Sequence, residues 1–77
     1  MKYEIELTDT FGGEANYCWV KRQEIEIPDD LSGRALVRRS KQLLEVSHIP
    51  HRKTDYGETL RLDFPGVCVV MFIFPKN

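Results

Sequence analysis

Basic side chains in the middle of the chain are the residues best suited to chemistry, and that chemistry is the binding of anions. Arg34, Arg38 and Lys41 recur at intervals of four and three residues, which places them in one stripe on the outer face of a helix. Arg52 and Lys53 continue the positive charge in the next loop. Such a surface can contact nucleic-acid phosphates or an acidic patch on a protein. A solvated helix face without a partner is the alternative interpretation.

Charge is sorted along the chain. Residues 1–30 carry eight acids and three bases, whereas residues 31–54 carry six bases and one acid. The net charge of −1 therefore conceals two opposed fields, which can steer a partner. Glu4 and Glu6 belong to the acidic half, and we expect them on an exposed strand face that forms a second candidate binding surface. The pI of about 6.1 argues against a general nucleic-acid binder.

The residue types of a zinc site are present, but their spacing does not fit one. His48 and His51 have the spacing H-x-x-H, yet Cys18 and Cys68 are isolated, whereas structural zinc sites usually include a local C-x-x-C pair. We therefore predict no metal ion and no cofactor. We expect both cysteines to be small buried hydrophobic residues, not a disulfide.

Catalytic signatures are missing from the chain. The pair Gly12-Gly13 lacks the further glycines and the lysine of a phosphate-binding loop, and no nucleophile motif surrounds either cysteine. The sequence therefore predicts a binding protein, not an enzyme, and assigns no catalytic residue.

Hydrophobic periodicity predicts one α+β domain over residues 1–77, with the element order β-β-α-β-β. We expect a two-layer sandwich in which one helix covers one face of an antiparallel sheet. The helix should run from about Ser32, its N-cap, to about Val46, and residues 47–57 should form a connector. Reversals are expected within Asp9–Asn16 and at Pro65-Gly66. The predicted strands are Lys2–Thr8, Tyr17–Ile27 (with a bend, bulge or exposure at Lys21–Glu24), Glu58–Phe64 and Val67–Phe74.

The last predicted strand is apolar on both faces, while a single helix can cover only one of them. A homodimer would cover the second face, and so would the target of the protein. A strongly curled sheet would also bury it, as would Tyr17 and Trp19 if they folded over that face. We expect a dimer in solution.

Membrane insertion is not indicated. The longest apolar run has eight residues, far below the roughly 20 that a spanning helix needs. The first residues lack the apolar region of a secretory signal, so we expect a cytoplasmic protein.

The segment LTDTFGGEANYCWVKR (residues 7–22), with ALVRR (residues 35–39) downstream, resembles short uncharacterised proteins encoded by bacteriophages and prophages. The resemblance implies a genomic setting in which many small proteins inhibit host defence, anti-CRISPR proteins among them. It thus implies a non-enzymatic protein that binds a host protein or ribonucleoprotein complex in the host cytoplasm. A small nucleic-acid-binding accessory protein that uses the basic stripe is the alternative, and a module that binds another phage protein is a third interpretation.

Overall fold

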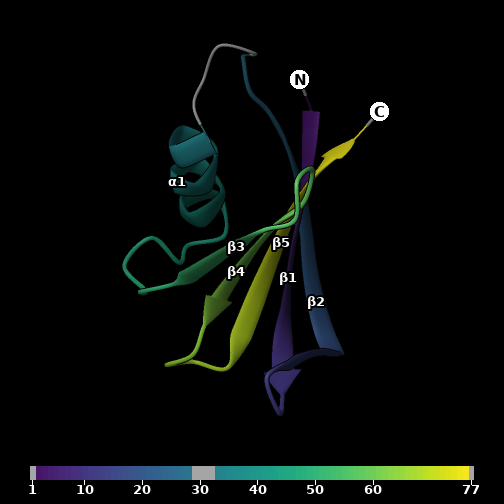
Figure 1. Ribbon diagram of the computed structural model, residues 1–77, viewed down its shortest axis with the longest axis vertical. Coiled ribbons are helices and arrows are strands. Elements are labelled where there is room, and N and C mark those ends of the chain that lie inside the picture. Colours follow the sequence, from purple (N-terminus) through teal and green to yellow (C-terminus); the bar gives the residue numbers. More distant parts are fainter. Residues whose placement is uncertain (1, 29–32, 77) are drawn as a thin grey trace.

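The computed structural model describes residues 2–28 and 33–76, which form a five-stranded antiparallel sheet with one helix on one side (Figure 1). The strand order is β2-β1-β5-β4-β3, so that β1 and β5 occupy the middle of the sheet. The predicted α+β class is confirmed. The elements are β1 (Lys2–Phe11), β2 (Glu14–Glu26), α1 (Gly33–Leu43), β3 (Arg52–Asp55), β4 (Leu60–Phe64) and β5 (Val69–Lys76).

The core lies between α1 and the sheet face beneath it. Alternation along the central strands supplies the sheet side, because Ile5 lies opposite Ile73 and Leu7 lies opposite Met71, and opposite residues of antiparallel strands share a face. Removing such side chains from water is the main contribution to stability in a domain this small. The buried core comprises Ile5, Leu7, Ile27, Leu36, Val37, Leu44, Val46, Leu62, Phe64, Met71 and Ile73.

A fifth strand, β3, lies within the segment predicted as a connector. It pairs with β4, with Arg52 opposite Asp63 and Asp55 opposite Leu60. Its four residues, RKTD, are polar on both faces, so hydrophobic alternation could not indicate it. β3 therefore forms a short polar edge, which is a common way for proteins to limit pairing with other chains.

Helix α1 ends three residues earlier than predicted, and its end is well defined. The amide of Val46 donates to the carbonyl of Lys41 (2.9 Å), and the amide of Glu45 donates to that of Gln42 (3.1 Å). Together with the left-handed φ of 61° at Glu45, these bonds form a Schellman motif. The motif turns the chain back towards the last turn of the helix. The predicted N-cap, Ser32, lies outside the described residues.

The β1–β2 hairpin is longer and less regular than predicted. Its turn is only Gly12-Gly13, whose φ values of 63° and 85° suit a two-residue hairpin turn. Thr8 pairs with Val20 and Thr10 with Ala15, so four residues of β2 (16–19) lie opposite one residue of β1. This bulge lies nearer the turn than the predicted irregularity at 21–24, although those side chains are exposed as expected. The bulge changes the direction of the hairpin tip.

At the other end of the sheet, Pro65-Gly66 reverses the chain as predicted, and the amide of Val67 donates to the carbonyl of Phe64 (3.1 Å). β5 begins two residues later than expected, because Cys68 adopts a left-handed φ of 55° in this turn. Within the described residues, no helix combines the length and the apolar character that crossing a membrane requires.

Candidate functional site

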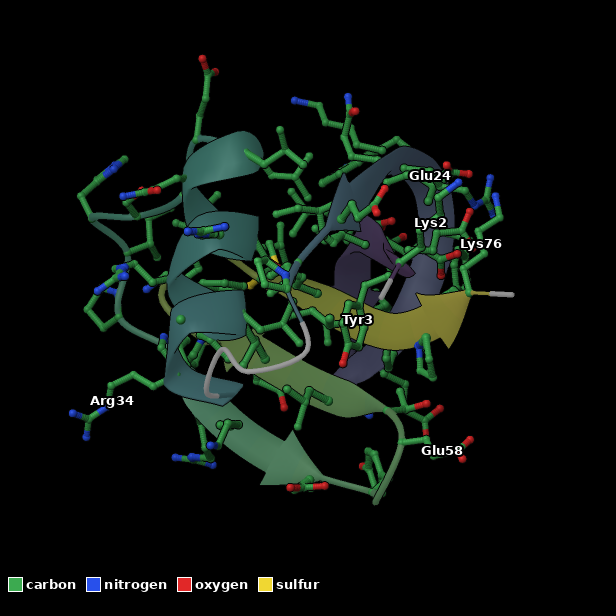
Figure 2. All side chains as sticks on the ribbon, turned by 90° about the horizontal axis from the view of Figure 1, so that it is seen from above. Lys2, Tyr3, Glu24, Arg34, Glu58 and Lys76 are labelled. Carbon is green, nitrogen blue, oxygen red and sulfur yellow. The ribbon has the colours of Figure 1, made fainter. Side chains whose placement is uncertain are left out.

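A groove of about 220 Å³ lies between α1 and the segment that follows it, and we call it the basic groove. Every titratable side chain that lines it, among the described residues, is basic. Arg34 and Arg38 are exposed on α1, one helical turn apart, and Figure 2 shows Arg34 extending away from the sheet. The lining residues are Arg34, Val37, Arg38, Lys41, Ser47 and His51.

Lys41 is a buried member of the groove, and the prediction that it lies in an exposed stripe is wrong. Its side chain is only 8% exposed. Its Nζ donates to the carbonyl of Ile49 (2.7 Å), lies 3.0 Å from Nδ1 of His51, and lies 5.6 Å from the centre of the Phe64 ring. The Schellman motif explains this position, because it brings residues 46–51 back against the last turn of α1.

The surroundings of His51 favour its neutral form. Partial burial lowers the pKa of His51 below its usual 6.5, and the positive charges of Lys41 and Lys53 lower it further. At pH 7 the neutral imidazole can therefore accept a hydrogen bond from Lys41 at Nδ1. The groove thus combines one ammonium group that is held by hydrogen bonds with two exposed guanidinium groups.

The structure divides the predicted basic surface between the two sides of the sheet. Lys53 lies opposite Leu62, on the helix side, near enough to influence His51. Arg52 lies opposite Asp63, on the face turned away from α1, which we call the open face. Arg52 lines a separate cavity there, of about 340 Å³, together with Arg61 and Asp63. Arg52 therefore belongs to a different site from Arg34 and Arg38.

The predicted acidic surface is largely neutralised within the chain. Glu6 is 9% exposed, so its predicted exposure is wrong, and it accepts hydrogen bonds from the Tyr17 hydroxyl (2.6 Å) and from Nε of Arg22 (3.1 Å). The bond to Glu6 raises the pKa of Tyr17 above its usual 10. Glu4 is half-buried on the same face.

Glu24 and Lys76 form a second ion pair at this end of the sheet, and Figure 2 shows the two side chains close together. The hydrogen bond and charge of Lys76 lower the pKa of Glu24, while Glu24 raises the pKa of Lys76. Exposed pairs of this kind contribute little to stability, but they fix where the charged ends lie.

The hairpin tip lies over the open face. Nη2 of Arg61 donates to the carbonyl of Gly13 (2.8 Å), the same guanidinium bonds Asp63 (3.1 Å), and it lies 5.7 Å from the centre of the Phe72 ring. On this face Val70 and Thr8 are fully buried. The curled hairpin therefore covers part of the apolar second face. The expected homodimer is not needed to bury Val70, and it stays a prediction.

Both cysteines are exposed and free, so the prediction that they are buried is wrong. Cys18 lies in the bulge of β2, where Asn16 donates to its sulfur, and Cys68 lies in the turn before β5. In residues 2–28 and 33–76, no three His, Cys, Asp or Glu side chains gather as metal ligands. The two histidines and two cysteines are therefore not brought together at one place.

Sequence reasoning did not find Ser47 in the groove, or the contacts of Tyr17 and Arg61 on the open face. The basic run His51-Arg52-Lys53 was the only sequence signal for His51. These contacts depend on a helix end and a strand bulge that no residue pattern indicated.

Comparisons of the chain with models of known families, with curated proteins and with solved structures find no match. The resemblance to phage-encoded proteins therefore stays a prediction. The basic groove is the structural feature that best supports a proposal about function.

Proposed function

We propose that this protein is a non-enzymatic binding protein of a bacteriophage or other mobile element that inhibits a host defence complex, anti-CRISPR activity being its most concrete form. The observation that carries the proposal is the basic groove, in which Arg34, Arg38, Lys41 and His51 gather without a carboxylate among the described lining residues. Like charges held together are unfavourable in the free protein, and an anionic group on a partner relieves that repulsion.

The groove has parts suited to holding such a group. Neither Arg34 nor Arg38 has an ion-pair partner among the described residues, and their planar guanidinium groups can bind a carboxylate or phosphate through two hydrogen bonds. Lys41 is already fixed by the Ile49 carbonyl, so its charge needs little ordering when the partner binds. Val37 adds an apolar side chain to the lining.

A protein surface or a ribonucleoprotein complex suits this groove better than bare nucleic acid. A volume of about 220 Å³ can accept one anionic group, whereas an extended phosphate backbone needs a longer basic track. The acidic N-terminal half also repels a polyanion. The alternative, a small nucleic-acid-binding accessory protein, is favoured only by the basic lining itself.

An infection assay tests the proposal. Cells in which a CRISPR system targets a phage should regain plaque formation when they express the wild-type protein. The Arg34→Ala/Arg38→Ala variant should not restore plaque formation, that is, it should not protect the phage from the CRISPR system. It should also bind the isolated effector complex about 100-fold more weakly, since two charge-assisted contacts of roughly 1.5 kcal/mol each are removed. Arg39→Ala is the matched control, because Arg39 is exposed on α1 but does not line the groove.

Fluorescence anisotropy separates the two functions. We expect weak binding to single-stranded and duplex DNA and RNA at physiological salt. Tight binding with a steep dependence on salt, together with no effect on any effector complex, would support the nucleic-acid accessory protein instead. Equal loss of protection in Arg39→Ala and in the double variant would show that the groove is not the contact surface.

A further inference from the structure

Strand β2 leaves a long edge of the sheet without a strand partner among the described residues. It has 13 residues and, within residues 2–28 and 33–76, pairs only with β1, whereas the opposite edge, β3, has four. Beyond the bulge at 16–19, residues 20–26 run without proline, glycine or a further break in register. A regular edge of about 20 Å offers backbone N–H and C=O groups to another strand.

The charges along this edge complement a second copy of the same edge. On the open face, β2 presents Val20, Arg22, Glu24 and Glu26 in turn, because Arg22 lies opposite Glu6 and Glu24 lies opposite Glu4. If two copies pair antiparallel about a two-fold axis through Gln23, Arg22 of each copy lies opposite Glu24 of the other. Opposite charges at directly facing positions stabilise a strand pair.

Neighbouring registers lack this property. An axis through Arg22 places arginine opposite arginine, and an axis through Glu24 places glutamate opposite glutamate. An axis through Ile25 places Glu24 opposite Glu26. Like charges at facing positions are destabilising, so the charge pattern selects the register centred on Gln23.

We propose that the protein forms a homodimer through antiparallel pairing of β2 edges about Gln23, so that the two sheets become one continuous sheet. The monomer already orients the charged ends that this pairing uses. Arg22 is held by Glu6 (3.1 Å) and Glu24 is held by Lys76, yet both side chains remain half exposed. The dimer extends these pairs into a network across the interface, and two-fold pairing of one edge closes without leading to a fibre.

Disulfide trapping tests the register directly. In a Cys18→Ser/Cys68→Ser background, Gln23→Cys should cross-link to itself under mild oxidation. Facing residues of an antiparallel pair have Cα atoms about 4.5–5.5 Å apart, which is within the range of a disulfide. Lys21→Cys is the matched control. Its Cα atom lies about 14 Å from that of its own copy in this register, too far for a disulfide, so it should not cross-link.

Sedimentation over a range of concentrations tests the charges. Arg22→Glu and Glu24→Arg should each weaken dimerisation at least tenfold, and the double exchange Arg22→Glu/Glu24→Arg should restore it. Lys21→Glu should have little effect, because Lys21 lies opposite Ile25 of the other copy. Circular dichroism melting of each variant shows that it remains folded.

Three results would overturn the proposal. These are a wild-type protein that stays monomeric up to millimolar concentration, equal cross-linking at positions 21 and 23, and dimerisation unaffected by either single exchange. If the protein were monomeric and substitutions in β2 abolished its protection of the phage, the β2 edge would be the contact surface for the host target instead. Because the groove lies on α1, failure of the dimer leaves the proposed function intact.

Discussion

The basic groove and the open face use the same kinds of charged residue in opposite ways. On the open face Arg22 pairs with Glu6 and Arg61 pairs with Asp63. In the groove Arg34 and Arg38 lie beside a buried lysine, with no carboxylate among the described lining residues. Charges with internal partners support the fold, whereas like charges held together are of use only when a partner neutralises them.

The difference arises from the elements that hold the two regions. In the sheet, pairing places Arg22 directly opposite Glu6, so the neutralisation of this pair follows from the strand register. On a helix, residues three and four apart share a face, so the run from Arg34 to Lys41 collects charge of one sign. Changes on the open face should therefore affect stability, and changes at the exposed part of the groove should affect binding.

The largest effect on stability is expected from Glu6→Ala. The substitution leaves the Tyr17 hydroxyl and Arg22 without their acceptor under the hairpin, and we expect a loss of about 2 kcal/mol in the free energy of unfolding. Urea denaturation measures the loss, and phage protection per folded molecule should not change. Glu4→Ala is the control, since Glu4 is half-buried on the same face, and its loss should be smaller. Equal losses would mean that the Tyr17–Glu6–Arg22 contacts do not secure the hairpin.

Lys41 shares features of both regions, because it lines the groove but, like the charged groups of the open face, has contacts within the chain. Lys41→Ala should lower the free energy of unfolding by about 1–2 kcal/mol, since it removes the bond to the Ile49 carbonyl and the packing of the aliphatic stem. Lys41→Met keeps the packing and removes the buried charge, so it should recover most of the loss. Chemical denaturation compares the two. If Lys41→Ala left the free energy of unfolding unchanged, the result would support the exposed position of Lys41 that the sequence predicted.

The sequence indicated the fold class because its apolar residues alternate in β1 and β4, form a continuous run in β5 and recur at helical spacing in α1. Pro65-Gly66 was recognisable as a turn because proline followed by glycine favours a chain reversal without any tertiary contact. The β3 strand was missed because its pairing with β4 is decided by position, not by hydrophobic pattern. Exposure at Lys21–Glu24 was predicted correctly, but the bulge at 16–19 was not predicted, because three hydrogen-bonding contacts that involve the side chains of Thr8 and Asp9 in β1 hold its backbone.

The candidate site was only partly predictable. Helical spacing located Arg34 and Arg38 correctly, since exposed residues one turn apart need no tertiary information. The burial of Lys41 could not be predicted, because it depends on the left-handed backbone conformation of Glu45 at the helix end. Glycine is the usual residue at this position, so the sequence did not indicate it. The place of Arg52 could not be predicted while β3 was taken for a loop, because only a strand sends neighbouring side chains to opposite faces.

A smaller effect is expected from Arg34→Ala/Arg38→Ala on stability, in contrast to its effect on binding. Neither arginine has an internal ion-pair partner in the described chain, so the free energy of unfolding should stay within about 0.5 kcal/mol of the wild type. At low salt the variant should be slightly more stable, because repulsion within the groove is relieved, and the gain should vanish in concentrated salt. Melting in about 20 mM and about 500 mM NaCl tests this. A clear loss of stability would mean that these arginines support the fold, as Arg22 does.

The smallest effect is expected from protonation of His51, and it has opposite signs for stability and binding. Well above pH 6.5 the ring is neutral in both the folded and the unfolded chain. As the pH falls, the unfolded chain takes up the proton first, because burial, Lys41 and Lys53 lower the pKa in the folded state. Stability should therefore fall as the pH decreases from 6.5 through the lowered pKa. An anion in the groove favours the imidazolium form, so binding should tighten over the same range.

His51→Gln should remove both dependences, whereas His48→Gln should keep them, since His48 is exposed and does not line the groove. Unfolding curves and binding isotherms of the two variants between about pH 8 and pH 5 supply the comparison, and the histidine resonances report the protonation itself. If binding weakened while stability fell, the lost Lys41–His51 contact would dominate over the added charge. The groove would then act through its shape and its arginines alone, and His51 would only position Lys41.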